Sequence, residues 1–477
     1  MNRPNIQRVF DIFKQLNAIP RPSHHEQRVA DYLCRFAEQR GLEFERDAEN
    51  CVVIRKPATP GYEAAEPIVL LNHMDMVCVG MNDPLNDPIE AYIDGDWMKA
   101  RGTSLGADNG IGLSMALAVL DDPDIVHGPL EVITTTNEED GMSGAAQLAP
   151  NFLHGRKVIN LDSEDYDTIT TGAAGACLQF HRIPISRRNS PEGHSWLKIC
   201  FSGGLGGHSG VDINKGRCSA VIPLWGLLQA IAAEYEFDVA DINLGEANAS
   251  IASSAHIIIC IPPGEAAQFV LDQQTLMNNW LNEQFGSTDP NMRCDIDYCE
   301  PLNTVINREA LEALMLSLEA TPQGVVKMSD SIKDTVETSN NVGRIIFEQD
   351  HIFVSTHTRS FNDSVMAQLS RDIADNFARN GATTELIMEA PAWQEDQHSQ
   401  FLRITSDTFN DVLGWRPRMV AMHFVLEAGF FVRHYPGIQI ASIGPRIVEP
   451  HSTSERVQLS TVTDIWEVLL ELLRRLA

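Results

Sequence analysis

Short apolar runs alternate with segments of helical periodicity over the first 175 residues. Val29, Leu33 and Phe36 recur at helical spacing, and Gly41 follows where a helix would end. Runs rich in Val, Ile, Leu and Thr, each bounded by turn residues, predict strands at 51–56, 67–72, 129–136 and 157–161, with a helix at 109–120. This alternation predicts an α/β fold whose central sheet is covered by helices on both faces.

The pattern changes after about residue 175 and changes back near residue 390. Between these points, strand-like runs and long helical stretches are typical of a separate α+β domain. We therefore predict one domain from residues 1–175 and 390–477, with residues 176–389 inserted into it. The N-terminal MNRPNIQRVFDIFKQL is predicted to be an amphipathic helix.

Charge and composition narrow the classes of function. The 477 residues include 36 basic and 65 acidic ones, giving a formal net charge of -29, and no basic stripe follows a helix or strand, so nucleic acid is not expected as a partner. No run of 18 apolar residues predicts a membrane span. Nine scattered cysteines without a C-x-x-C pair indicate reduced thiols and a cytoplasmic protein.

Polar side chains follow three of the predicted strands. His73 comes directly after the strand at 67–72, Glu138 and Glu139 follow the next strand closely, and Asp162 follows the third. Ligand sites in open α/β sheets lie beyond the carboxyl ends of the strands. We therefore expect these side chains at one edge of the sheet.

Individual motifs leave alternatives open. In H-M-D, Asp75 can orient His73 by accepting its second ring N–H, although an ordinary polar loop has the same pattern. Asp108 lies in the glycine-rich loop 102–112, where it can bridge two cations or simply cap the following helix. The loop matches neither phosphate-binding glycine motif.

The joint pattern decides between these alternatives. Glu138 and Glu139 are adjacent carboxylates whose repulsion a cation would relieve, unless they form a solvated acidic turn. His451 adds a distant imidazole. Mixed histidine and carboxylate ligands favour a site for two zinc or manganese ions over a calcium or thiolate site.

With these residues assembled, the chain resembles the M20 metallopeptidases, and most closely the aminoacyl-histidine dipeptidases. The resemblance spans almost the whole length and is carried by IPRPSHHE (19–26), LLNHMDMV (70–77), DGDWMKARGTSLGADNGIG (94–112), VHGPLEVITTTNEEDGMSGA (126–145), INLDSED (159–165), GGLGGHSG (203–210), TPQGVV (321–326), VETSNNVG (336–343) and SIGPRIVEPHS (442–452).

The resemblance implies a zinc-peptidase-like catalytic domain with a central mixed sheet and an inserted α+β lid and dimerisation domain. It implies metal-dependent hydrolysis of carnosine-like Xaa-His dipeptides in a cytoplasmic homodimer, with two divalent ions, zinc first and manganese or cobalt as alternatives. The ligands would be His73, Asp108 and Asp162 for one ion and Asp108, Glu139 and His451 for the other. Glu138 would be the general base, Asp75 would orient His73, and His208, Arg359 and Asn248 would contact the substrate.

Two departures from the family pattern concern the substrate. Where the dipeptidases have Arg-Asn-Ala-Ile-Pro, this chain has NASIAS (248–253), and where they have His-Ala-Gly-Leu-Glu it has HFVLE (423–427), in which Phe424 and Val425 replace small residues. Two alternatives therefore stay open: a hydrolase retuned to another dipeptide or an N-acyl amino acid, and a metal-binding protein that has lost catalysis. The second would lack the base or a metal ligand, and none is missing.

Overall fold

The computed structural model describes residues 6–81, 83–330, 332–394, 396 and 398–477. The described chain divides into two compact units. Unit 1 comprises Met1–Gly172, Trp393–Ala421 and Leu426–Ala477, and unit 2 comprises Ala173–Ala392 together with Met422–Val425. The short segment 422–425 thus packs within unit 2, although its neighbours on both sides belong to unit 1.

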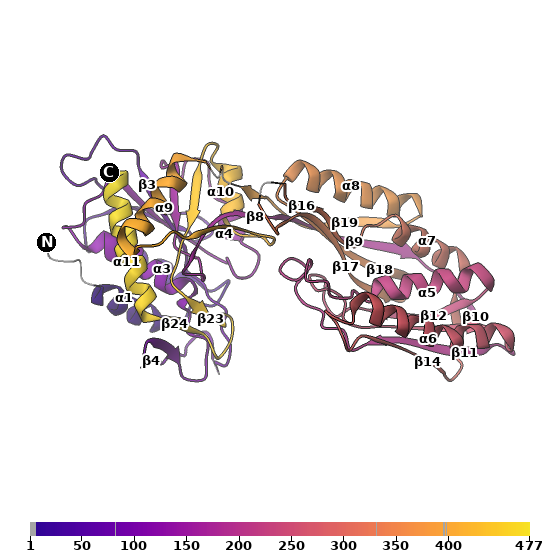
Figure 1. Cartoon of the computed structure of the whole chain (residues 1–477). Coiled ribbons are helices and arrows are strands. Elements are labelled where there is room, and N and C mark those ends of the chain that lie inside the picture. Colours follow the sequence, from indigo (N-terminus) through magenta and orange to yellow (C-terminus); the bar gives the residue numbers. More distant parts are fainter. Residues whose placement is uncertain (1–5, 82, 331, 395, 397) are drawn as a thin grey trace. The chain divides into compact units, whose positions relative to one another are not determined.

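A mixed sheet forms the centre of unit 1 (Figure 1). Its strands run in the order β1-β2-β6-β3-β7-β22-β8-β20, and β21 pairs with β8. The strands are β1 (Glu43–Arg46), β2 (Val52–Lys56), β3 (Ile68–His73), β6 (Leu130–Thr135), β7 (Lys157–Asn160), β8 (Thr168–Ala173), β20 (Trp393–Gln394), β21 (Arg418–Met422) and β22 (Gln439–Ser442). The four strands predicted from the sequence correspond to β2, β3, β6 and β7.

Helices pack on this sheet and bury one large apolar core. The central helix is apolar all round, as a fully enclosed helix must be, and it contacts α1, β3 and β6. The helices of unit 1 are α1 (Gln7–Asn17), α2 (Gln27–Glu38), the central α3 (Ala107–Asp121), α4 (Ser143–Ala146), α9 (Gln400–Leu413), α10 (Ala428–His434) and α11 (Leu459–Leu476). The predicted N-terminal helix is therefore found from residue 7, and residues 1–5 lie outside the described residues.

A smaller antiparallel sheet of unit 1 has the order β23-β24-β5-β4. Its strands are β4 (Ala91–Asp94), β5 (Trp97–Ala100), β23 (Ile447–Val448) and β24 (Arg456–Gln458). The loop between β23 and β24 carries His451, so this sheet anchors the C-terminal loop beside the segment that leads into α3.

Strand register brings the predicted polar residues to one edge of the central sheet. β3 pairs in parallel with both β6 and β7, with His73 opposite Thr135 and Leu71 opposite Asn160. Asp162 lies two residues beyond Asn160, level with His73. The carboxyl ends of these strands therefore present their side chains together, as the sequence pattern predicts.

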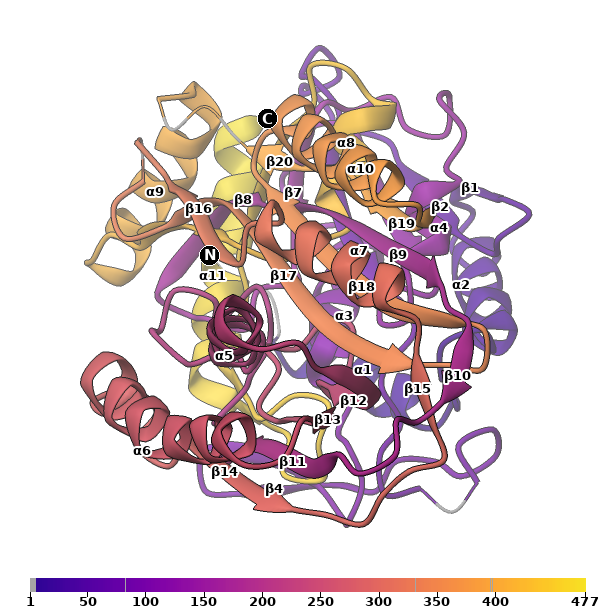
Figure 2. The same ribbon diagram turned by 90° about the vertical axis from the view of Figure 1, so that its right-hand side faces the viewer.

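Unit 2 contains a long, mainly antiparallel sheet whose order is β14-β11-β13-β12-β17-β18-β9-β19, with β16 paired to β17. Figure 2 shows α5, α6, α7 and α8 in front of these strands, and α6, α7 and α8 contact them directly. The elements are β9 (Gly175–Pro184), β10 (Arg187–Asn189), β11 (Ser195–Ser202), α5 (Val221–Glu234), β12 (Asp238–Leu244), β13 (Ala255–Ile261), α6 (Glu265–Phe285), β14 (Arg293–Tyr298), β15 (Thr304–Ile306), α7 (Arg308–Glu319), β16 (Gly324–Met328), β17 (Val336–Phe347), β18 (His351–Ser360), α8 (Asp363–Arg379) and β19 (Thr383–Ala390).

In the part of the chain that the structure describes, no helix combines the length and apolarity needed to cross a membrane. The nine cysteines are all free thiols.

Candidate active site

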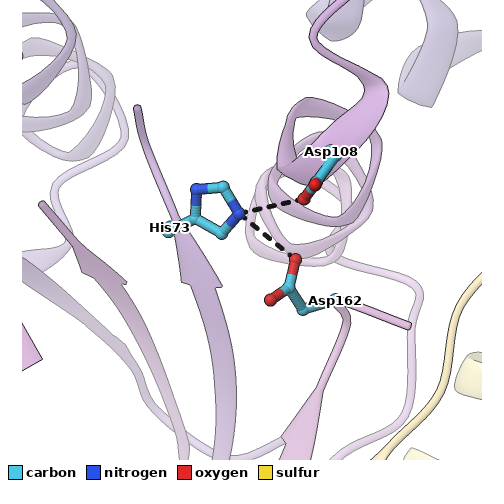
Figure 3. A group of neighbouring side chains, drawn as sticks. All are labelled: His73, Asp108 and Asp162. Atoms are coloured by element: carbon cyan, nitrogen blue, oxygen red, sulfur yellow. Dashed lines mark hydrogen bonds and ion pairs between the residues drawn. The ribbon is translucent and has the colours of Figure 1, made fainter. Parts of the chain in front are cut away.

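Three potential metal ligands from separate segments of unit 1 converge at the end of β3. The Nε2 atom of His73 lies 3.0 Å from Asp108 Oδ1 and 3.3 Å from Asp162 Oδ1 (Figure 3). His73 is the last residue of β3, Asp162 follows β7, and Asp108 lies in the first turn of α3, where its backbone is not yet helical. The sequence prediction named these three residues as one ligand set, and the structure brings them together.

A second group shares Asp108 with the first. His451 Nε2 lies 3.2 Å from Asp108 Oδ2 and 2.8 Å from Glu139 Oε2. The two oxygens of Asp108 thus face different histidines, which is the arrangement expected of a carboxylate that bridges two cations. Within each group, one ligand atom from each residue lies within 4.8 Å of the others. His451 is the most accessible member, with 46% of its side chain exposed.

Burial and charge shift the pKa values of these groups strongly. Burial opposes ionisation of Asp108, but hydrogen bonds from His451 and His73 outweigh it and hold the pKa of Asp108 below its usual value. The same contacts with Asp108 and Glu139 raise the pKa of His451 to about 11. Burial raises the pKa of Asp162 to about 7. Three carboxylates thus share this cluster with two histidines, and the charge of Asp108 adds to the effect of burial on the pKa of Asp162.

The donor set fits divalent cations. Glu139 Oε1 is buried and has no hydrogen-bond partner, and unpaired buried carboxylate oxygens are costly. Asp162 Oδ1 is also buried, with His73 Nε2 3.3 Å away. A cation at each group would satisfy these atoms and relieve the repulsion among the carboxylates. Two histidines and three carboxylates suit zinc, manganese or cobalt better than softer or harder metals.

Asp75 does more than the sequence indicated. Its Oδ1 lies 3.5 Å from His73 Nδ1, on the side of the ring away from Asp108. Its oxygens also accept the backbone N–H groups of Glu138 at 3.0 Å and Glu139 at 3.2 Å, and the hydroxyl of Ser23 at 2.8 Å. Asp75 therefore fixes both the His73 ring and the turn that carries Glu138 and Glu139.

Glu138 lies among the acidic residues of this cluster. Burial raises its pKa well above the usual range for a carboxyl, and the neighbouring charges of Asp162, Glu427 and Glu139 raise it further against the opposing charge of His73. A carboxyl that holds a proton more tightly than usual is suited to accept one from an activated water. Glu138 is thus half-buried among acidic neighbours, with a pKa above the usual carboxyl range.

Glu427 is a buried acid that the sequence interpretation did not single out. Thr135 Oγ1 donates to its Oε2 at 2.7 Å, its Oε1 has no partner, and burial raises its pKa to about 8. It is the last residue of HFVLE, so the motif itself was noticed but the position was not assigned. The signal available was a glutamate at the end of an otherwise apolar run.

In unit 2, the backbone determines the tautomer of His208. Its Nδ1 accepts the N–H groups of Gly210 and Val211, each at 3.2 Å. The Nδ1 atom therefore carries no proton, and the ring of neutral His208 must carry it on Nε2. Burial and the charge of Arg359 lower the pKa of His208, which favours this neutral form. His208 is thus poised to donate one hydrogen bond through Nε2.

Arg359 lies in a buried polar cluster of unit 2. Its side chain is 3% exposed, its Nε has no partner, and its Nη2 donates to Ser209 Oγ at 3.4 Å. His357 is on the same face of β18, is buried, and has no hydrogen-bond partner on either ring nitrogen. Burial, together with the charges of Arg359 and His208, lowers the pKa of His357 well below its usual value. The cluster has one fixed positive charge and unused donors, so an anionic group is the ligand it can accommodate.

Both departures from the family pattern lie beside His208. Ser209 donates its backbone N–H to Ala249 O at 2.8 Å, so NASIAS runs next to the histidine loop, and Asn248 Oδ1 is buried without a partner. The Phe424 ring packs edge-on against His208, with centroids 6.3 Å apart. The replaced residues thus touch the segment that carries His208.

Comparison with known proteins identifies the family. Residues 69–475 match the model of peptidase family M20/M25/M40. The chain belongs to this family. The predicted M20 membership and α/β fold class are confirmed by this match and by the structural likeness described next.

Two relatives match almost the whole chain. The cytosol non-specific dipeptidase of Escherichia coli is 36% identical over 477 residues, covering 98% of each chain. The crystal structure of aminoacylhistidine dipeptidase from Vibrio alginolyticus superimposes with a TM-score of 0.92 at 33% identity, covering 98% of this chain and 96% of that one. An aminopeptidase from Bacillus cereus shares the fold at a TM-score of 0.62 and 18% identity. The predicted enzyme class, a metallo-dipeptidase, agrees with the family and with the names of the first two relatives.

Proposed function

We propose that this chain is a cytoplasmic dipeptidase that hydrolyses the amide bond of small dipeptides with two divalent metal ions, zinc first. The observation that carries the proposal is the shared carboxylate of Asp108, which faces His73 on one side and His451 on the other. The cytosolic location follows that of the Escherichia coli relative by name.

Each residue has a role in this proposal. His73, Asp108 and Asp162 would hold one ion, and Asp108, Glu139 and His451 the other. When bound, the ions would supply an activated water and polarise the substrate carbonyl. Glu138 accepts the proton of that water and returns it to the leaving amine. Asp75 holds His73 and the Glu138 turn in place. His208 donates from Nε2 to the carbonyl oxygen, and Arg359 and Asn248 bind the polar end of the substrate.

The substrate range is the finer part of the proposal. One relative is named for aminoacyl-histidine substrates and the other is called non-specific. We infer that Xaa-His dipeptides are among several substrates. The reason is that Phe424, which packs on the His208 ring, changes the segment expected to contact the side chains of the substrate. A preference for another dipeptide or for N-acyl amino acids is the alternative that Phe424 and the NASIAS segment support.

The test is turnover by the purified protein loaded with zinc, manganese or cobalt. β-Alanyl-histidine, a set of α-dipeptides and a set of N-acetyl amino acids would be assayed side by side. We expect hydrolysis of dipeptides, including Xaa-His. Turnover of N-acyl amino acids alone would support the alternative, and no turnover of any Xaa-His substrate would remove that part of the proposal.

Glu138→Gln distinguishes catalysis from metal binding alone. Removing a general base lowers the rate by roughly 10²- to 10⁴-fold, while the metal content should stay at two ions per chain. Asp140→Asn is the matched control, because Asp140 belongs to the same acidic run but is exposed and pairs with exposed His24. Inactivity of the wild-type protein with both ions bound would favour a binding protein.

We also propose that the protein forms a homodimer through unit 2. Strand β16 carries exposed Val325, Val326 and Met328, an apolar surface that a second copy would cover. Light scattering on the 52.8 kDa chain would show a particle of about twice that mass. Val326→Lys should shift it to the monomer, and a wild-type monomer at micromolar concentration would contradict the proposal.

A further inference from the structure

A buried carboxylate outside the ligand set holds the loop that carries Asp108. Glu455 is 3% exposed, and its Oε2 accepts the N–H groups of Leu105 at 2.6 Å and Gly106 at 3.0 Å. Its Oε1 accepts that of Ala107 at 2.7 Å and lies 3.5 Å from the nitrogen of Asp108. One side chain thus satisfies the consecutive backbone donors immediately before the bridging ligand.

A buried arginine holds the same loop from its carbonyl side. Arg21 is 1% exposed, and its Nη2 donates to Gly106 O at 2.6 Å. Its Nη1 donates to Met74 O at 3.2 Å and Asp75 O at 3.0 Å. The Arg21 guanidinium therefore ties the Asp108 loop to the segment that follows His73, and its own backbone O accepts Met76 N at 3.1 Å.

The glycines of the loop make room for this arginine. A Cβ atom at Gly106 would lie 2.5 Å from Arg21 Nη2, and one at Gly110 would lie 2.6 Å from the same atom. Gly106 also has a φ of +66°, which side-chain-bearing residues rarely adopt. At both positions Arg21 Nη2 would be the atom nearest to the added Cβ, followed by Met76 Sδ at Gly106 and Phe13 Cε2 at Gly110.

We propose that Arg21 and Glu455 are positioning residues of the metal centre. They fix Asp108 relative to His73 by holding opposite faces of the same peptide segment, and neither is itself a ligand. The inference rests on the proposed metal role of Asp108. It gives a role to Arg21 of the motif IPRPSHHE, to which the resemblance assigned none, and to Glu455, which follows His451 by four residues and lies outside the quoted motifs. Residues that orient ligands typically change metal affinity by ten- to a hundredfold when altered.

The experiment measures zinc affinity of the metal-free protein by competition with a chelator. Glu455→Gln keeps the size of the side chain but leaves only one oxygen for the three close N–H donors, and Arg21→Lys removes the planar guanidinium. We expect each to raise the zinc dissociation constant by roughly ten- to a hundredfold. We also expect each to change the visible absorption of the cobalt-loaded protein, which reports ligand geometry.

Asp96→Asn is the matched control. Asp96 is an exposed carboxylate of the same unit that accepts Ser460 N at 2.9 Å at the start of α11, and its hydrogen bonds go to Gln458 and Ser460 rather than to a metal ligand or to the segment 105–108. The zinc affinity and the cobalt spectrum of the Asp96→Asn protein should equal those of wild type.

Thermal unfolding of the metal-free proteins separates positioning from general stability. A folded Glu455→Gln with wild-type zinc affinity and cobalt spectrum would overturn the inference, whatever its melting temperature. If that variant does not fold, Arg21→Lys decides by the same criteria. Failure of wild type to bind two ions would instead overturn the proposed function, so the two failures are distinct.

Discussion

The two units bury opposite kinds of polar chemistry. Unit 1 gathers carboxylates: besides the three acidic ligands and the half-buried Glu138, it encloses Asp75, Glu427 and Glu455. Unit 2 encloses Arg359 and the histidines His181, His357 and His423, while its buried carboxylate Asp289 is satisfied by the backbone N–H groups of Leu205 and Cys218. Neither set is neutral by itself, because the acids of unit 1 exceed its buried cations, and the hydrogen bond of Arg359 goes to the hydroxyl of Ser209 rather than to a carboxylate.

This contrast shows which ligand each unit requires. Burial without compensation is costly, so a surplus of buried acids is tolerated where cations bind. A buried arginine with free donors is tolerated where an anion binds. A carbonyl oxygen matches the metal site proposed in unit 1, and a carboxylate matches the arginine of unit 2. The electrostatics of each unit alone thus agree with the proposed reaction.

Removing the shared ligand Asp108 should disrupt the metal site among the buried acids of unit 1. Asp108→Ala takes a ligand from both groups, so we expect the bound metal to fall from two ions per chain to less than one. Activity should drop by roughly a thousandfold or more, since bound ions supply several kcal/mol of transition-state stabilisation. Elemental analysis and steady-state rates on one dipeptide would measure both effects. Full activity with one ion or none would refute the bridging role.

Three ligands, His73, Glu139 and Asp162, could be predicted at one sheet edge because they follow predicted strands. The full set, which includes His451, was implied only by the family resemblance. His73 and Asp162 could be placed from the strand ends alone, and Asp108 from its loop. Glu455 could not, because it reaches Leu105 across 350 residues, and no periodicity encodes such a contact. The position of Glu427 was not predicted for the same reason, because its hydrogen-bond partner Thr135 lies 292 residues away in the sequence.

The substrate side was predicted less completely, also for a physical reason. The pattern within strand β18 places His357 and Arg359 on one face, but it does not show that both lack partners. That property depends on what other segments leave open around them. Likewise, the edge contact between Phe424 and His208 joins two loops, whose paths are set by packing rather than by local propensity.

Removing the buried cation should weaken substrate binding without affecting the metals. Arg359→Met deletes the charge while keeping an apolar stem. A charge-assisted hydrogen bond contributes about 1.5–3 kcal/mol, so we expect kcat/KM for dipeptides to fall by roughly ten- to a hundredfold. For the same dipeptides as C-terminal amides, the variant and wild type should differ little.

Arg182→Gln serves as the control for Arg359→Met. Arg182 lies on the neighbouring strand β9 and pairs with Glu385 at the surface, where ion pairs contribute little. Its kinetics should match those of wild type. Equal losses of Arg359→Met on the free acids and the amides would argue against carboxylate recognition.

The smallest predicted effect concerns the neutral histidines of unit 2. His181 is buried, stacks on Phe377 with centroids 3.9 Å apart, and contacts the hydroxyls of Thr356 and Thr384. Burial lowers the pKa of His181 to about 3. The unfolded chain binds the proton near pH 6.5, so this residue contributes stability above that pH and loses it as the pH falls toward 3.

The expected slope is about 1.4 kcal/mol per pH unit for each such histidine. Urea unfolding of metal-free wild type and His181→Gln between pH 7 and pH 4 would isolate it. The difference in unfolding free energy between the two proteins should be constant near pH 7 and shrink by about 1.4 kcal/mol per unit below pH 6. A constant difference down to pH 4 would mean that His181 accepts its proton in the folded protein. Unit 2 would then tolerate a second buried cation close to Arg359's sheet, and the contrast between the units would be weaker than the structure indicates.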